Sequence, residues 1–151
     1  MTFRYLNSTL VLNKIFENIN LKLIADTSVI IAVITSEHTK SQLLELTSGY
    51  ELYAPASIHW EIGNAISAMY KRKSIGNRDG CFILSEYSKI PISTVGINIA
   101  EALRIAYNFN MYAYDAYMLQ CAIEQKAELI TLDKKLVEIS KKMNIKTIEV
   151  N

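Results

Sequence analysis

The sequence is poor in the residues that zinc sites and disulfide-stabilised domains require. Its 151 residues include only two cysteines, Cys81 and Cys121, and two histidines, His38 and His59. Neither cysteine has another cysteine or a histidine at ligand spacing, which argues against a zinc site. Both cysteines lie in apolar helical patterns, so we expect reduced core residues and no disulfide.

Long apolar runs and an excess of one charge are also lacking. No apolar segment approaches the ~18 residues that span a membrane, and the N-terminus has no signal-peptide pattern. We therefore expect a cytoplasmic protein without a membrane anchor. The formal net charge is +1, so a nucleic-acid binder of this kind would need a local basic patch. The G-x-S-x-G turn of many serine hydrolases is absent, and both histidines are interpreted as structural or surface residues.

What the chain does contain is typical of one globular α/β domain. Hydrophobic residues make up 50% of the sequence and charged residues 21%, enough apolar side chains to bury a core. Strand-like apolar segments alternate with helical patterns, which predicts a parallel sheet covered by helices on both faces. Residues 1–20 are interpreted as an N-terminal extension, either a short helix or a loose segment, and residues 21–151 as the folded domain.

The expected elements follow from periodicity and from breaks at Gly, Pro and Ser. The expected strands are 22–26, 50–54, 90–92, 129–132 and 146–150. The expected helices are 27–34, a second one through Leu43 and Leu46 that stops at Gly49, then 57–73, 77–88, 96–108, 114–125 and 133–143.

Four acidic residues occupy related places in this pattern. Asp26 and Asp133 each follow an apolar strand, and Glu61 lies beside the buried stripe of the helix 57–73. Asp115 lies on the apolar stripe of its helix, where a carboxylate is unfavourable unless something pairs with it. That stripe is completed by Met118, Leu119, Ala122 and Ile123. Because ligands bind at the carboxyl ends of parallel strands, we expect the four carboxylates to converge there.

Each acid alone also has an ordinary explanation. Asp26, Asp115 and Asp133 could cap helix N-termini, and Glu61 could be a solvated residue at a helix edge. The joint placement favours a cluster instead. Clustered carboxylates repel one another and some would be forced to protonate, a conflict that a divalent cation removes. Oxygen ligands without His or Cys suit Mg²⁺ or Mn²⁺, which predicts metal-assisted hydrolysis of a phosphodiester.

Four segments resemble the PIN-domain ribonucleases, most closely the VapC toxins of toxin–antitoxin pairs, in order and at similar spacing from about residue 22 onward. They are Ala25-Asp26-Thr27-Ser28, Pro55 to Glu61-Ile62-Gly63-Asn64-Ala65, Tyr114-Asp115-Ala116 and Ile130-Thr131-Leu132-Asp133. The resemblance implies a three-layer α/β/α sandwich with a parallel sheet and an endoribonuclease that uses Mg²⁺ or Mn²⁺. It also implies an RNA substrate, a cognate antitoxin and a homodimer as partners.

The resemblance assigns roles residue by residue. Asp26, Glu61 and Asp115 match the three central catalytic and metal-binding acids, and Asp133 matches a fourth, more variable one. Hydroxyl residues that orient an acid or a water are expected at Thr27, Ser28 and Thr131, with Asn64 as a weaker candidate. The N-terminal extension is a departure, because many relatives begin almost directly at the first strand.

Two further features have alternative interpretations. The densest basic group is formed by Lys71, Arg72, Lys73 and Arg78. It could contact the RNA backbone or merely complement a helix dipole beside a solvated loop. We expect Trp60 in the core. Two alternative functions stay open: an RNA-processing nuclease without an antitoxin, and a PIN-like binding module that has lost catalysis.

Overall fold

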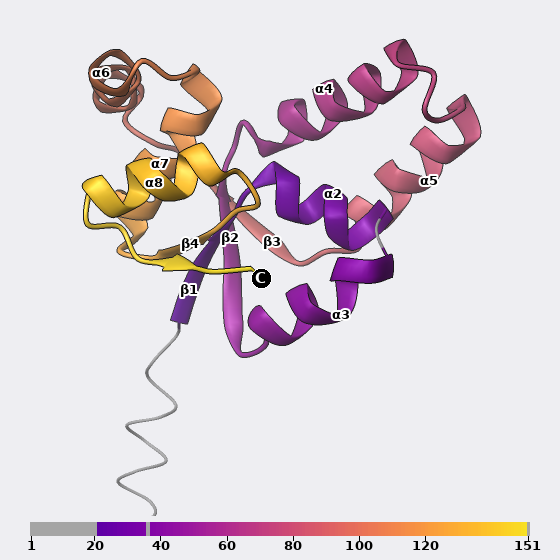
Figure 1. Ribbon diagram of the computed structural model, residues 1–151, viewed down its shortest axis with the longest axis horizontal. Coiled ribbons are helices and arrows are strands. Elements are labelled where there is room, and N and C mark those ends of the chain that lie inside the picture. Colours follow the sequence, from indigo (N-terminus) through magenta and orange to yellow (C-terminus); the bar gives the residue numbers. More distant parts are fainter. Residues whose placement is uncertain (1–20, 36, 151) are drawn as a thin grey trace, which may run out of the picture.

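The computed structural model describes residues 21–35 and 37–150, so the expected extension, residues 1–20, lies outside the described residues. Five parallel strands form one sheet in the order β3-β2-β1-β4-β5 (Figure 1). The strands are β1 (Leu21–Ala25), β2 (Tyr50–Pro55), β3 (Ile92–Val95), β4 (Glu128–Ile130) and β5 (Thr147–Ile148). The helices are α2 (Thr27–Thr35), α3 (Glu37–Leu46), α4 (Ile58–Lys71), α5 (Asn77–Tyr87), α6 (Ile99–Phe109), α7 (Ala113–Gln125) and α8 (Lys134–Lys142).

The helices cover both faces of the sheet, as the alternation of elements predicted. The chain moves outward from β1 to β2 and β3, then returns to β4 on the other side of β1. Because crossovers between parallel strands are right-handed, this reversal places α2 to α5 on one face and α6 to α8 on the other (Figure 1). The expected three-layer α/β/α fold is therefore confirmed. The reversal also puts the end of β1 at the switch point, where open sheets bind ligands.

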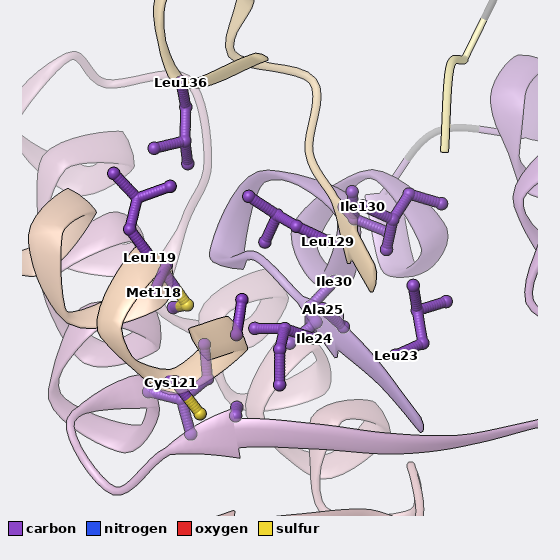
Figure 2. Close-up of a cluster of buried hydrophobic side chains, with 14 of the residues drawn as sticks. Leu23, Ile24, Ala25, Ile30, Met118, Leu119, Cys121, Leu129, Ile130 and Leu136 are labelled. Atoms are coloured by element: carbon purple, nitrogen blue, oxygen red, sulfur yellow. The ribbon is translucent and has the colours of Figure 1, made fainter. Parts of the chain in front are cut away.

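The core fills both faces of the sheet, and Figure 2 shows the part around the central strands, α7 and α8. Leu23 and Ile24 of β1 and Leu129 and Ile130 of β4 are fully buried, as are further side chains from the two helices. Those are Met118, Leu119 and Cys121 of α7, with Leu136 of α8 almost fully buried. Burying each large apolar side chain stabilises the fold by about 1.5–3 kcal/mol, so the strand ends that carry the acids are rigidly held.

Several predictions about single residues were wrong. Trp60, expected in the core, is 66% exposed, because α4 buries Ile58, Ile62 and Ile66 and turns residue 60 away from them. Cys81 is exposed on α5, whereas Cys121 is buried and both cysteines are free, as predicted. Ile123, placed on the apolar stripe of α7, is 44% exposed.

Some element boundaries also moved. β3 lies after Pro91 instead of across it, at the sheet edge as expected. α6 begins at Ile99 because the Asn98 side chain caps it by accepting a hydrogen bond from the Glu101 backbone N–H at 3.2 Å. β5 is only two residues long. Among the described residues, no helix has the length and apolarity needed to cross a bilayer.

Candidate active site

Asp26 lies at the centre of the candidate site, directly after β1, and is 7% exposed. Its backbone N–H donates to the Ile130 carbonyl at 3.1 Å, which continues the β1–β4 pairing by one residue. Its side chain does not cap α2; instead Oδ2 accepts hydrogen bonds from Ser28 Oγ at 2.5 Å and Thr131 Oγ1 at 2.8 Å. The capping interpretation is therefore wrong for Asp26.

The two hydroxyls that hold Asp26 are themselves fixed by backbone donors. Ser28 Oγ accepts from the Leu132 N–H at 3.0 Å, and Thr131 Oγ1 accepts from the Asp133 N–H at 3.0 Å. Each hydroxyl has one hydrogen, and both hydrogens point at Oδ2 of Asp26. Among the described residues Oδ1 of Asp26 accepts no hydrogen bond, so this oxygen is the one left for a ligand.

Glu61 lies in the first turns of α4 and is held in the same manner. Oε2 accepts from Thr27 Oγ1 at 2.8 Å, and Oε1 accepts from Ser57 Oγ at 2.9 Å. Thr27 immediately follows Asp26, so its hydroxyl joins the β1–α2 turn to α4. Glu61 is only partly exposed, which excludes the interpretation of a freely solvated helix-edge residue.

Ser57 is a site residue that the sequence analysis missed. It precedes Glu61 by four residues at the start of α4, and the hydroxyl and the carboxylate meet because side chains four apart share a helix face. That spacing was readable in the sequence. A serine at a helix start is typical of a capping residue, and this expectation hides its role as a donor to Glu61.

Asp115 and Asp133 differ in their surroundings. Asp115 lies in the first turn of α7, and no hydrogen bond to its side chain occurs among the described residues. Asp133 is exposed and caps α8, since Oδ1 accepts from the backbone N–H groups of Lys135 at 2.8 Å and Leu136 at 3.2 Å. The capping interpretation is right for Asp133, and among the described residues its other oxygen accepts no hydrogen bond.

The carboxylates affect one another's protonation, which places them within electrostatic range. Burial raises the pKa of the Glu61 carboxyl; the hydrogen bonds from Thr27 and Ser57 oppose that rise, and the charges of Asp26 and Asp115 add to it.

The pKa of Asp115 is also raised, first by burial and then by the charges of Asp133 and Asp26, with Lys135 acting in the opposite direction. Coulomb repulsion thus couples Asp26, Glu61, Asp115 and Asp133, as expected for neighbouring like charges. We call these four residues the row of acids.

The row carries little compensating charge. Within residues 21–35 and 37–150 no lysine or arginine forms a salt bridge with any of the four acids. As the side chains lie, no three acidic, histidine or cysteine groups of the described chain are close enough together to hold a metal ion. The acids thus share one edge of the sheet without forming a closed cage.

The remaining predicted residues lie further out. Asn64 is exposed, and its side chain makes no hydrogen bond with the described residues. The basic group of Lys71, Arg72, Lys73 and Arg78 is exposed at the turn between α4 and α5, which project from the sheet as a helical hairpin (Figure 1). His59 accepts or donates a hydrogen bond with the Tyr87 hydroxyl at 2.8 Å, in keeping with a structural role.

The comparisons with known proteins agree on one family. The family model of the PIN domain matches residues 23–142. The crystal structure of PAE2754 from Pyrobaculum aerophilum is similar, with a TM-score of 0.66 and 18% identity over 85% of this chain and 84% of that chain.

A second similar structure is VapBC2 from Rickettsia felis bound to a DNA fragment from their promoter. The TM-score is 0.61 and the identity 13%, over 85% of this chain and 98% of that chain. At such identities the two structures show a shared fold. A comparison with curated protein sequences gave no significant match.

Proposed function

The chain belongs to the PIN domain family, and on that premise we propose that it is an endoribonuclease, dependent on Mg²⁺ or Mn²⁺, that acts as the toxin of a toxin–antitoxin pair. The row of acids at the C-terminal edge of the sheet carries this proposal. Two of its members, Glu61 and Asp115, have raised pKa values because they are partly buried beside other carboxylates. A protein keeps such an arrangement at a cost in stability, which favours a functional role over a structural one.

The chemistry of the donor set fits a hard divalent cation. Asp26, Glu61 and Asp115, with Asp133 as a fourth, offer only carboxylate oxygens, which Mg²⁺ and Mn²⁺ prefer. The ion would offset the mutual repulsion of the row. When bound, it supplies the positive charge that acidifies a water and stabilises the phosphoryl oxygens of the substrate.

The protein's own contribution is to hold the acids in place. Thr27 and Ser57 fix both oxygens of Glu61, and Ser28 and Thr131 fix one oxygen of Asp26. Hydrogen bonds of this kind orient a ligating carboxylate, and the two to Glu61 also oppose the rise in its pKa. The hydrogen bonds of Thr27, Ser28 and Thr131 thus support the orienting roles expected of these residues, whereas the Asn64 side chain makes no such contact with the described residues.

The basic group suits a place on the RNA path. Lys71 follows Glu61 by ten residues along α4, which corresponds to about 15 Å. At 3.4 Å per nucleotide of a stacked strand, that span equals about four nucleotides. A strand cut at the acids would therefore reach the basic group of Lys71, Arg72, Lys73 and Arg78 with its backbone.

The partners belong to the same proposal. The similar VapBC2 structure is a complex bound to promoter DNA, and this supports a cognate antitoxin as a partner of the present chain. We include a homodimer and a cytoplasmic location in the proposal. Expression in a bacterial host should arrest growth, co-expression of the cognate antitoxin should restore it, and the Asp26→Asn chain should be harmless.

The decisive experiment is an RNA-cleavage assay with purified protein. The wild-type chain should cleave RNA with Mg²⁺ or Mn²⁺, lose cleavage in EDTA and regain it when the metal is added back. Asp26→Asn should reduce cleavage at least a hundredfold, while Glu45→Gln, an exposed acid on α3, serves as a matched control and should cleave normally. Cleavage that resists EDTA, or that persists in Asp26→Asn, would exclude this function.

A further inference from the structure

A small cavity lies beside the row of acids, between the C-terminal ends of β2 and β3. Its volume is about 200 Å³. Its walls include Pro55 and Ser57 after β2, Val95, Ile97 and Ile99 after β3, and Tyr117 of α7. No charged side chain of the described residues lines it, so it differs from the acids in chemistry although it adjoins them.

Ser57 connects the cavity to the acids. It lines the cavity and donates its hydroxyl hydrogen to Glu61 Oε1 at 2.9 Å. β2 also lies next to β1, and Asp26 directly follows β1. Since neighbouring strands are about 4.8 Å apart, the end of β2 that forms one wall of the cavity lies one strand spacing from the end of β1, which Asp26 follows.

We propose that this cavity receives one nucleobase of the RNA substrate, beside the bond that is cut. This inference rests on the proposed nuclease function and adds a site of base selection to it. Apolar walls without charge disfavour a phosphate or a metal ion. The volume is also too small for a peptide helix, which is about 10 Å wide. A flat, uncharged ring next to a phosphate site is the occupant that meets both limits.

Tyr117 gives the cavity an aromatic wall that is already held in position. Its ring packs edge-on against Tyr114, with centroids 5.9 Å apart and an interplanar angle of 83°. Bases of single-stranded RNA stack on such aromatic side chains. A ring fixed by a neighbour loses little conformational freedom when a base stacks on it.

The loop that follows β3 offers groups to read the edge of a base. Within the described residues, the backbone N–H groups of Gly96 and Ile97 donate to no protein acceptor. Gly96 also lines the cavity, and a side chain added there would meet nothing within 4 Å. Unpaired donors beside an apolar slot select bases by their acceptor pattern, which stacking alone does not do.

The inference implies that the enzyme cuts single-stranded or looped RNA. A base inside a duplex is stacked on both faces and cannot enter a protein cavity. Cleavage should therefore occur in loops and should prefer one base at a fixed position next to the cut.

The test measures kcat/KM in Mg²⁺ on single-stranded oligonucleotides that differ at each position around the cut, with an abasic substrate included. Tyr117→Leu removes the aromatic wall, and Ile99→Trp narrows the cavity from an exposed position of α6. Leu103→Trp makes the same kind of change one turn further along α6, outside the cavity. The wild-type and Leu103→Trp proteins should discriminate at least tenfold between bases at one position and against the abasic substrate. The two cavity variants should lose most of that discrimination because their KM for the preferred substrate rises. They should cleave the abasic substrate at the same rate as the wild type.

Unchanged base preference in both cavity variants, with native circular dichroism, would overturn the inference and leave the nuclease function standing. A second measurement does not depend on cleavage. In EDTA, titration of the Asp26→Asn protein with UMP, CMP, AMP and GMP should shift the amide resonances of Gly96 and Ile97 for at least one nucleotide. No shift with any of the four at millimolar concentration would also overturn it. Absence of all RNA cleavage by the wild type would instead remove the proposed function.

Discussion

Thr131 donates its hydroxyl hydrogen to Asp26 Oδ2 at 2.8 Å, across 105 residues of sequence. Thr131 Oγ1 in turn accepts a hydrogen bond from the Asp133 backbone N–H at 3.0 Å. One buried hydroxyl, 3% exposed, therefore links two of the four acids and fixes the end of β4 to the end of β1.

Replacing Thr131 by valine keeps the side-chain shape and removes both hydrogen bonds. Because the Asp133 N–H and the Asp26 carboxylate each lose a partner, we expect the free energy of unfolding to fall by about 1–3 kcal/mol. RNA cleavage should fall as well, since Asp26 is no longer held. Thr131→Ser keeps the hydroxyl and is the control. Urea unfolding and cleavage rates measured on the three proteins decide the matter; valine and serine variants that behave alike would contradict the role given to this hydroxyl.

The Asp115→Asn variant should be more stable than the wild type at neutral pH without metal. The pKa of the Asp115 carboxyl is raised in the folded protein, so its ionisation opposes folding. This destabilisation is present above the folded-state pKa and disappears as the pH falls toward about 3.9, the ordinary value.

Thermal denaturation in EDTA between pH 4 and pH 8 should therefore show a difference in Tm of a few °C at pH 7 and none near pH 4. A Tm difference between the two proteins that is independent of pH would show that repulsion between the Asp115 carboxylate and the other acids does not affect stability.

Mg²⁺ or Mn²⁺ should stabilise the wild-type protein and have little effect on Asp115→Asn. An ion that binds only the folded state adds about 2.7 kcal/mol when its concentration is a hundred times its Kd. For a domain of this size that corresponds to about 5–10 °C in Tm. The same Tm measurement with Ca²⁺ and with Na⁺ at matched ionic strength is the control, because a shift caused by charge screening alone would be the same for every salt. Equal shifts in both proteins would count against a site built from Asp115.

A triple variant in which Lys71, Arg72 and Lys73 are replaced by glutamine should bind RNA more weakly, and its binding should depend less on salt concentration. Each lost phosphate contact on a single strand lowers the slope of log K against log salt by about 0.7, so three contacts lower it by about 2. The control is Lys141→Gln with Lys142→Gln, two lysines of α8 that pair with Glu149 and Glu138. Binding curves with the Asp26→Asn protein avoid cleavage during the measurement. An unchanged slope would mean that the basic group does not contact the RNA backbone and only complements the dipole at the end of α4.

The fold was readable from the sequence because its signals are local. Apolar runs such as those around Ile24 and Ile130 became the buried central strands, and the positions of Asp26 and Asp133 after those strands followed directly. β3 was misplaced by a few residues, since an edge strand is defined by its pairing with β2 and the segment around Pro91 carries little pattern of its own.

The errors share one physical origin. Trp60 and Cys81 lie in helices with clear apolar patterns, yet both are exposed. Residue type and periodicity predict that a helix has a buried face, but the neighbouring helices decide how wide that face is. The omission of Ser57 is related: Glu61 was predicted as a site residue, but which side chain at the helix start donates to it depends on where α4 begins and how it is placed.

The contact between Thr131 and Asp26 also has a consequence for the order in which activity arises during synthesis. Closing a loop of this length is slow compared with forming local helices, and the partner of Asp26 is translated more than a hundred residues after it. A nascent or prematurely terminated chain that stops before β4 therefore has Asp26, Glu61 and Asp115 but lacks the Thr131 hydroxyl that holds Asp26. Such a fragment should not cleave RNA, so the proposed activity should arise only after β4 has been synthesised.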